Sequence, residues 1–451
     1  GGMLSVAEDY LRQLNPQARL EVFGQELNEE TYAICRSDMM LKGQDASHIT
    51  VGNSFSEDGH AGRSFDYCLA NPPFGVEWKK VEDLVKAEAD KLGFRGRFGA
   101  GLPRINDGSF LFLQHMISKM KPVEEGGSRI AIVFNGSPLF TGAAGSGESE
   151  IRRWIIENDW LEAVVALPDQ LFYNTGISTY FWIVTNRKSA ERRGKVQLVD
   201  GRELFTKMRK SLGEKRKEIS PTQVEEITRL YAEFRDSDRV KIFANEAFGY
   251  MRITADRPSR GEWRPHEVAV RLAENPGWFD ANGISPLEEY AITTVLSELP
   301  EIIGSQKEAE RQMKKRFGGL GAKEIKALAE LIRVPADTIV TDAKGNPEAD
   351  PDLRDNENVP LPATSVQWEA DVADRLATIE YRTAINDYLA TEVHPYVPDA
   401  WVDYDKTKIG YEIPLTRNFY KYVPPRPLAD IDAEIKQLEA EIQELLREVA
   451  E

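Results

Sequence analysis

The chain has 451 residues, 41% of them hydrophobic and 29% charged, which is typical of a globular protein with two or three domains. No apolar run reaches the ~20 residues of a membrane-spanning helix, and no export signal is found. The two cysteines give neither a disulfide framework nor a zinc spacing. We therefore expect a cytoplasmic protein. The net charge of −17 argues against non-specific binding of nucleic acid over the whole surface, while leaving room for a local basic channel or a partner that carries such contacts.

Strands and helices alternate through the first half of the chain. Apolar residues at helical spacing predict a helix over residues 3–14, and Asn28 is the expected cap of a second helix that ends at Gly43. Runs rich in β-branched and aromatic residues predict the strands between the helices. The expected strands cover residues 19–27, 48–55, 64–74, 127–140, 160–168 and 178–187, and two more helices cover residues 108–121 and 148–159.

This alternation predicts a doubly wound, Rossmann-like α/β domain with a mostly parallel sheet, which we place at residues 1–200. Ligands of such folds bind at the carboxyl ends of the strands. The candidate site residues are therefore those that follow each strand: Gln25-Glu26, Gly52 to Ser54, Asn71 to Phe74, and Asn135-Gly136.

The second half of the chain has a different pattern. Residues 201–426 are expected to form a mixed, mostly helical region. Within it, residues 203–250 look charged and helical, residues 250–258 form a strand, residues 285–335 form small helices, and residues 340–362 have the composition of a linker.

The last segment, residues 427–451, has apolar residues spaced alternately three and four apart, which is a heptad pattern. It predicts a helix that docks along a partner's helices, or an amphipathic helix that packs on its own domain. The apolar positions are Leu428, Ile431, Ile435, Leu438, Ile442, Leu445 and Val449.

The segment CLANPPFG, residues 68–75, ends an expected strand with an amide, two prolines and a phenyl ring. Methylation of an exocyclic amino group needs acceptors for its two N–H bonds, and the Asn71 side chain and the Pro72 carbonyl can supply them. Pro72 and Pro73 stiffen the loop, and Phe74 can stack on a base extruded from a duplex. The alternative is a plain proline-rich turn.

Other polar residues at strand ends carry weaker signals. Glu26 can accept hydrogen bonds from ribose hydroxyls, although acidic residues also open helices for electrostatic reasons. Asn53-Ser54 can meet a nucleoside base or form a turn. Gly1-Gly2 can be the end of a glycine-rich cofactor loop or the residue of an expression tag. The basic clusters at residues 187–193, 207–217 and 307–316 are expected to be solvated surface.

The order of these motifs resembles a known family. Gly-Gly-Met-Leu opening a helix, then GQEL, GNSF and ANPPFG, is similar to motifs I to IV of amino-group DNA methyltransferases. The segments LPDQLFYNTGISTYFWIVTNRK, DPDLRDNENVPL and IGYEIPLTRNFYKYVPPRPLADIDAEI resemble the modification (M) subunit of type I restriction-modification systems, so the resemblance covers essentially the whole chain.

The resemblance implies S-adenosyl-methionine as cofactor and adenine N6 in double-stranded DNA as target. It implies assembly with a second M subunit, with a specificity subunit through the carboxyl-terminal helix, and with restriction subunits. Asn71, Pro72, Pro73 and Phe74 then form the catalytic motif, with Glu26 on the ribose and Asn53 and Ser54 at the adenosine base. Residues 350–362 become part of the folded carboxyl half.

The resemblance also assigns Phe172, Thr175 and Gly176 to a later motif that shapes the pocket for the target base, although Phe172 can equally be a core residue. No metal ligands are implied.

In the family, Gly1-Gly2 would close a loop of the form Asp-Pro-x-x-Gly-x-Gly-Gly. The strand before this loop and an amino-terminal helical domain are absent from the sequence, so we expect weakened binding of the cofactor by this chain. Two alternatives stay open: a catalytically silent assembly subunit, and methylation of another amino group, such as cytosine N4 or a protein glutamine.

Overall fold

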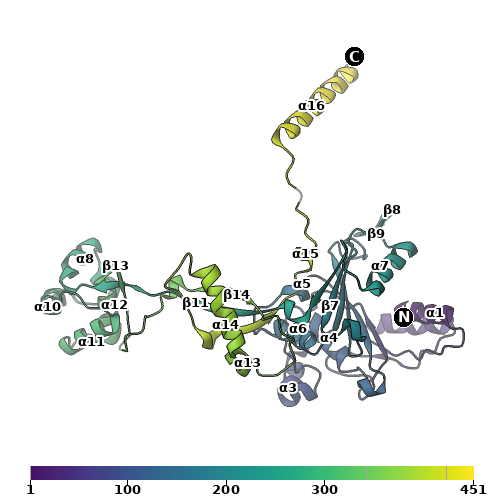
Figure 1. The fold of residues 1–451 in the computed structure, drawn as a ribbon, viewed down its shortest axis with the longest axis horizontal. Helices are drawn as coiled ribbons and strands as arrows, with labels where there is room; N and C mark the ends of the chain where they lie inside the picture. Colours follow the sequence, from purple (N-terminus) through teal and green to yellow (C-terminus); the bar gives the residue numbers. More distant parts are fainter. Residues whose placement is uncertain (1, 343, 423, 451) are drawn as a thin grey trace.

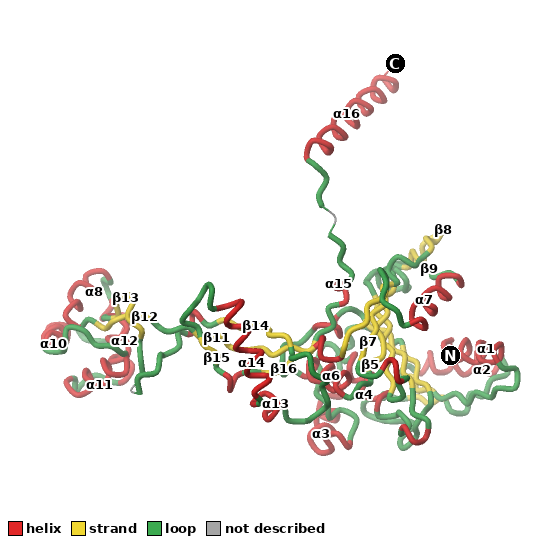
Figure 2. Tube along the Cα trace, viewed as in Figure 1, coloured by secondary structure: helices red, strands yellow, loops and turns green. Residues whose placement is uncertain are grey.

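A computed structural model of the chain describes residues 2–342, 344–422 and 424–450 (Figures 1 and 2). Its elongated body has an α/β part at the amino-terminal end, a small sheet in the middle and a helical module at the far end (Figure 1). None of the helices in the described ranges is long and apolar enough to cross a membrane.

The chain begins with a small unit of two strands and two helices: α1 (Gly2–Leu14), β1 (Gly24–Glu26), α2 (Glu29–Leu41) and β2 (Ile49–Val51). β1 and β2 pair in parallel, and α2 connects them. The Asn28 side chain accepts a hydrogen bond from the Thr31 N–H at 2.8 Å, which confirms the predicted cap. Leu4 of α1 packs against the small apolar core of this unit.

Six strands form the main sheet: β3 (Tyr67–Ala70), β4 (Arg129–Phe134), β5 (Leu161–Leu167), β6 (Thr179–Thr185), β7 (Lys195–Asp200) and β10 (Val240–Ala244). Their order is β10-β7-β5-β6-β4-β3. β3 runs parallel to β4, and β5 to β7, but β6 is antiparallel to both of its neighbours and β10 is antiparallel to β7.

The prediction of a mostly parallel sheet holds for four of these six strands, since β3, β4, β5 and β7 run in one direction, but it is wrong for β6 and β10. β6 returns from β5 through the loop of residues 168–178 and inserts between β5 and β4, and a loop without a crossover helix reverses the chain direction. The sheet also continues past residue 200, the expected end of the catalytic domain, because β10 is its edge strand.

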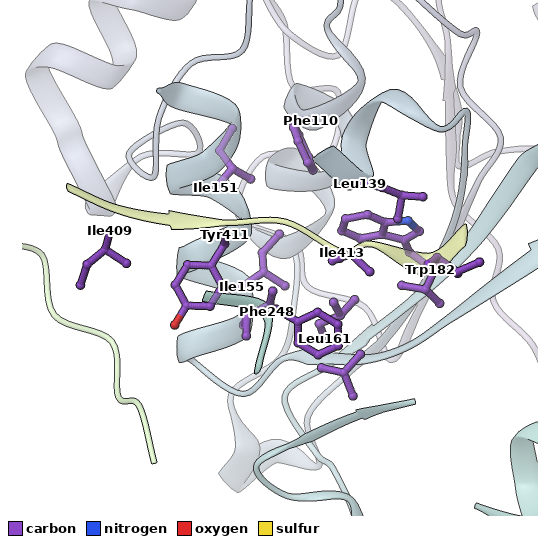
Figure 3. Packing of buried hydrophobic residues seen from close by; sticks show 14 of the residues in the cluster. Phe110, Leu139, Ile151, Ile155, Leu161, Trp182, Phe248, Ile409, Tyr411 and Ile413 are labelled. Atoms are coloured by element: carbon purple, nitrogen blue, oxygen red, sulfur yellow. The ribbon is translucent and has the colours of Figure 1, made fainter. Parts of the chain in front are cut away.

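The helices that accompany this sheet are α3 (Glu82–Leu92), α4 (Ser109–Ile117), α5 (Ser137–Phe140) and α6 (Gly147–Glu157). Trp182 of β6 is fully buried near Phe110 (Figure 3). Its ring lies 6.0 Å from that of Phe110 and 5.3 Å from that of Phe134. The apolar runs at residues 160–168 and 178–187 thus form buried strands, as predicted. The run at residues 127–140 is a strand only over Arg129–Phe134, and its last four residues form α5.

The β1–β2 sheet and the main sheet are separate sheets among the described residues. β3 pairs only with β4, and β1 pairs only with β2, so the two sheets are not joined by a ladder of hydrogen bonds. An open apolar hollow of about 490 Å³ lies between α1 and β3 and is lined by Gly2, Met3, Val6, Ala7, Tyr10 and Leu69.

The expectation that residues 203–250 are helical is wrong for much of this segment. The segment contains β8 (Thr206–Leu212), β9 (Lys215–Glu218), α7 (Pro221–Glu233) and the strand β10. β8 and β9 form an antiparallel hairpin that extends outward from the α/β part (Figure 2). Only α7 matches the prediction, and Ser220 and Gln223 form a capping box at its start.

A second sheet stands beside the first: β11 (Gly249–Asp256), β14 (Asp355–Pro360), β15 (Trp401–Val402) and β16 (Lys408–Tyr411), with helices α13 (Ala373–Ala377), α14 (Ile379–Tyr388) and α15 (Leu415–Asn418). β11 pairs with β14 on one side and with β15 and β16 on the other. The predicted strand at residues 250–258 is confirmed. The linker expected at residues 340–362 is contradicted by β14, in agreement with the family resemblance.

Helix α6 fastens the second sheet to the first. The Arg152 guanidinium donates hydrogen bonds to the carbonyl oxygens of Tyr411 at 2.6 Å and Pro138 at 3.0 Å. The buried Glu157 carboxylate accepts from the Tyr411 hydroxyl at 2.9 Å and from Arg375 at 2.9 Å. One apolar core runs through both sheets, and Figure 3 shows its side chains on α6, on β16 and at Phe248, just before β11.

The helical module at the far end contains β12 (Arg260–Trp263), α8 (Val268–Glu274), α9 (Trp278–Asn282), α10 (Pro286–Ser297), α11 (Gln306–Arg316), α12 (Ala322–Leu331) and β13 (Arg333–Ile339). β12 and β13 pair antiparallel, and the helices surround a separate core that includes Trp263, Leu296 and Leu328. The small helices predicted at residues 285–335 are confirmed.

The final helix, α16 (Leu428–Ala450), projects away from the body (Figure 1). Its described seam residues are solvent-exposed, from 36% for Ile431 to 76% for Leu428. The side chain of Val449 lies outside the described residues. Of the two arrangements that the heptad pattern left open, the structure has the one in which the seam does not pack on the chain's own domain.

Candidate active site

The Asn71–Phe74 loop begins where β3 ends. β3 is in register with β4 from Tyr67 opposite Arg129 to Ala70 opposite Ile132. The ladder stops there, since a proline nitrogen has no hydrogen to donate. Pro72 is buried, Phe74 is half-buried, and Asn71 is exposed. The loop is thus anchored at one proline while its amide faces solvent.

The two hydrogen-bond acceptors proposed for the amino group are unoccupied by the protein itself. Within the described ranges, no group donates a hydrogen bond to the side-chain oxygen of Asn71 or to the carbonyl oxygen of Pro72. An exposed amide and a carbonyl on a stiff loop are therefore both available to a ligand with N–H donors.

Phe74 meets one of the residues predicted from the later motif. Its ring lies 6.4 Å from that of Phe172, at an interplanar angle of 83°. Phe172 lies on the loop between β5 and β6, and it forms an isolated bridge with Thr175. The structure thus brings Phe74, Phe172 and Thr175 together, and exposed Gly176 follows on the same loop.

The Phe172 loop is held from its other side by the β8–β9 hairpin. The Gln170 carbonyl accepts hydrogen bonds from the N–H groups of Arg216 at 3.0 Å and Lys217 at 3.2 Å, and the Tyr173 carbonyl accepts one from Glu214 at 3.2 Å. The loop's position beside Phe74 therefore depends on a hairpin that sequence reasoning did not predict.

Glu26 and Asn53 lie next to one another at the carboxyl end of the small parallel sheet. The Glu26 carbonyl accepts a hydrogen bond from the Gly52 N–H at 2.9 Å, which brings the two strand ends together. The carboxylate Oε1 of Glu26 accepts one from the Asn28 N–H at 3.0 Å. No described group donates to Oε2, so this oxygen is available to hydroxyl donors.

Asn53 and Ser54 form a tight turn after β2. The Asn53 side-chain oxygen accepts a hydrogen bond from the Phe55 N–H at 2.9 Å, and the Ser54 carbonyl accepts one from Arg97 at 2.6 Å. Arg97 also donates to the Phe55 carbonyl at 2.9 Å and pairs with Glu88 at 2.6 Å. Arg97 thereby fixes the turn, yet no sequence pattern singled it out.

The two groups of predicted residues are not in direct contact. No described hydrogen bond or ring contact joins Glu26 or Asn53 to the Asn71–Phe74 loop. Gly2 lines the apolar hollow together with Leu69, which lies two residues before Asn71. Gly1 lies outside the described residues.

The free cysteine on β3 is a poor nucleophile. Cys68 of β3 packs against the main core, and burial raises the pKa of its thiol to about 12, which keeps it protonated at neutral pH. Within the described ranges, no cluster of three histidine, cysteine or acidic side chains is arranged to hold a metal ion.

Comparison with known proteins gives consistent matches. The chain is 23% identical over 71% of its length to the MjaIX methylase subunit of a type I restriction enzyme from Methanocaldococcus jannaschii, covering 54% of that protein. It is 31% identical over 41% of its length to the HindI methylase subunit from Haemophilus influenzae, covering 38% of that protein. The chain thus spans about half or less of the length of these relatives.

One solved structure with a related sequence is the methyltransferase subunit of a type I restriction-modification system from Streptococcus thermophilus. It is 27% identical, with 50% of this chain and 44% of that chain aligned at a TM-score of 0.42. The family model for N-6 DNA methylases matches residues 1–248, more than half of the chain and all of the candidate site. The chain therefore belongs to the N-6 DNA methylase family.

Proposed function

We propose that this chain is a subunit of a type I restriction-modification system and methylates adenine N6 in double-stranded DNA with S-adenosyl-methionine. The observation that carries the proposal is the pair of free acceptors, Asn71 Oδ1 and the Pro72 carbonyl, on a proline-stiffened loop beside the Phe74–Phe172 pair. Membership of the N-6 DNA methylase family supports it.

In the proposed reaction, the two acceptors bind the two hydrogens of the adenine amino group. This favours a pyramidal nitrogen whose lone pair points out of the ring, so it can form the new carbon–nitrogen bond. Phe74 stacks on the extruded base, with Phe172 edge-on behind it. The nitrogen becomes cationic on accepting the methyl group and then loses a proton to solvent, so no tuned general base is needed.

The residues at the end of the small sheet fit the cofactor. S-adenosyl-methionine supplies an electrophilic methyl group when it is bound. Glu26 Oε2 is available to accept hydrogen bonds from ribose hydroxyls, and the Asn53 side-chain nitrogen is available as a donor, since only its oxygen is engaged in the turn. We propose that Gly2, which lines the apolar hollow together with Leu69, forms part of another wall of the cofactor site.

The partners proposed are a specificity subunit, bound through α16, together with a second copy of the chain and a restriction subunit. The exposed heptad seam of α16 supports the first of these contacts. A specificity subunit would also supply the sequence reading. It would supply much of the phosphate contact as well, which the net charge of −17 of this chain does not favour.

The test is transfer of labelled methyl from S-adenosyl-methionine to DNA by the chain assembled with its specificity subunit. We expect Asn71→Ala to lower the rate by about 100- to 1000-fold, the range found when one transition-state hydrogen bond is removed. Asn275→Ala is the matched control, because Asn275 lies in the helical module at the far end, and its rate should be unchanged.

Equal rates for Asn71→Ala and the unaltered chain would contradict the proposed role of the loop. Label recovered in protein and not in DNA would favour glutamine methylation, and label on cytosine would favour cytosine N4. Mass spectrometry of the digested products distinguishes the three.

A catalytically silent assembly subunit is the second candidate. The observation that favours it is the missing ladder between the two sheets, which leaves Glu26 and Asn53 on a separate sheet from Asn71. Calorimetric titration with S-adenosyl-methionine decides between the two candidates, since a silent subunit binds no cofactor while retaining the specificity subunit.

A further inference from the structure

The sequence contains three basic clusters, and the structure shows that they differ in burial and in their position relative to the candidate active site. In the first, at residues 187–193, Lys188 is buried and paired with Asp159 at 2.6 Å, and Arg192 is buried beneath the rings of Tyr231 and Phe234. The third, on α11, lies in the helical module at the end of the molecule remote from β8 and β9 (Figure 1). Only the second, at residues 207–217, lies beside the candidate active site.

This second cluster is the β8–β9 hairpin, residues 206–218. It has six basic and two acidic side chains, a net charge of +4 in a chain whose total is −17. Lys207, Arg209, Lys210 and Arg216 are exposed, and none forms an ion pair with a described acidic residue. Lys207 stands directly opposite Lys217 across the pair of strands, an arrangement of like charges that destabilises a hairpin.

The other cations of the hairpin attach it to the loop that carries Phe172. Lys217 forms an ion pair with Asp169, and its ammonium lies 3.9 Å from the centre of the Phe205 ring. Lys215 lies 4.9 Å from the centre of the Tyr173 ring. Together with the backbone hydrogen bonds to Gln170 and Tyr173, these contacts fix the direction of the free cations relative to Phe172 and Phe74.

We propose that the β8–β9 hairpin is an arm that binds the phosphate backbone of double-stranded DNA next to the extruded base. The proposal rests on the proposed function. Unpaired cations on an extended backbone are suited to a row of phosphates, and the contacts of the hairpin with Gln170 and Tyr173 hold it against the loop that carries Phe172. A local positive arm also explains how an acidic chain can approach DNA.

The test measures binding of a short fluorescein-labelled DNA duplex of arbitrary sequence by fluorescence anisotropy, over a series of salt concentrations. The variant is Lys207→Gln/Arg209→Gln/Lys210→Gln. The matched control is Lys314→Gln/Lys315→Gln/Arg316→Gln, which removes the same charge from exposed positions on α11.

We expect the hairpin variant to weaken binding by at least about tenfold at low salt and to reduce the slope of log K against log[salt] by about 2 to 3, since each lost phosphate contact is worth ~0.9. The control should retain nearly the slope of the unaltered chain. The charge-preserving variant Lys207→Arg/Arg209→Lys/Lys210→Arg should also bind normally, which shows that charge and not the fold of the hairpin is responsible.

An unchanged slope in the hairpin variant, or equal losses in the hairpin variant and the α11 control, overturns the proposal. Calorimetric titration with S-adenosyl-methionine on the same proteins separates this outcome from failure of the proposed function. If the hairpin variant binds cofactor but DNA binding is unaffected, the hairpin proposal fails alone. If no variant binds cofactor but the slope still falls, the hairpin proposal stands and the methyltransferase function fails.

Discussion

Arg97 connects the turn at Asn53 and Ser54 to helices α3 and α4. Besides its contacts with the turn and with Glu88, its guanidinium lies 3.2 Å from Nδ1 of His115 on α4. Burial lowers the pKa of His115 from 6.5 to about 4, and the charge of Arg97 adds to the effect. His115 is therefore neutral in the folded chain at neutral pH.

This environment predicts an acid-sensitive fold. Because the folded-state pKa of His115 lies below its unfolded value, the unfolded chain binds the proton more tightly, and stability falls as the pH drops from about 6.5 to about 4. The loss approaches about 3 kcal/mol at the lower limit. Urea unfolding at a series of pH values measures it, and His115→Gln should flatten the profile across this window.

The carboxylates around His115 act in the same direction at the acid end of this window. Burial opposes ionisation of Asp58 and Glu88, but hydrogen bonds from Lys119 and Arg97 lower the pKa of each below its ordinary value, so the stability that each contributes is lost as the pH falls through its unfolded-state and then its folded-state pKa. The comparison with His115→Gln isolates the contribution of the histidine. His394→Gln, at a distant turn in the second sheet, is the control and should keep the full slope. The prediction is wrong if His115→Gln and the unaltered chain lose stability in parallel.

At the scale of single residues, the sequence predicted the positions where a proline or a capping amide restricts the backbone. Asn71 followed by two prolines marks a strand end, and Asn28 marks a helix start, and both lie where they were expected. Arg97 was not found, because its partners at Glu88, Ser54 and Phe55 come from segments that meet only in the folded chain. The roles proposed for Asn71, Glu26 and Phe172 stay predictions.

At the scale of elements, hydrophobic periodicity identified the buried strands and the long helices. It could not identify β8 and β9, because these mostly basic and polar strands have no regular apolar alternation. Backbone pairing between the two strands and with the Gln170 and Tyr173 carbonyls stabilises this hairpin, with Gly213 at φ +62° in its turn. The antiparallel insertion of β6 was also missed, since periodicity does not reveal a strand's neighbours.

Helix α16 gives a prediction at the same scale. Leu438 lies on the apolar seam at 51% exposure, so Leu438→Asp places a charge where a partner helix would pack and should abolish co-purification with the specificity subunit. Deletion of the residues after Pro427 should have the same effect and leave the catalytic fold intact. Pull-down with a tagged specificity subunit measures both.

The matched control for the seam is Ala440→Asp, on the opposite face of α16. It introduces the same residue in mid-helix, so it has the same cost in helix propensity without touching the seam. Binding lost equally in both variants would point to unfolding of the helix, and binding retained in Leu438→Asp would remove the seam from the interface.

At the scale of the whole molecule, the apolar cores show how the chain divides into folded units, and this division does not follow the order of elements along the chain. The main core joins the six-stranded sheet to β11, β14 and β16, while the far module has its own core around Trp263 and Leu328. The sequence suggested one boundary near residue 200, where the composition changes. It could not show that β16 returns to pack on α6, because these contacts span some 260 positions of sequence.

Two cores predict two unfolding transitions in calorimetry. Leu328→Ala empties part of the far core and should lower the midpoint of one transition, at a cost of about 2–5 kcal/mol. Ile132→Ala, equally buried in the main core, should lower the other. A single transition that shifts in both variants would show that the two cores unfold as one unit.

The segment between α15 and α16 determines how far a captured partner can move. Its nine residues include Pro424, Pro425 and Pro427, a composition that favours an extended and fairly stiff chain of about 3 Å per residue. A partner bound to the seam of α16 would therefore stay within roughly 30 Å of the point where α15 ends, at an effective local concentration near the millimolar range. Weak contacts between that partner and the body would then become nearly saturated, so the tether would convert one docking event into a multivalent assembly.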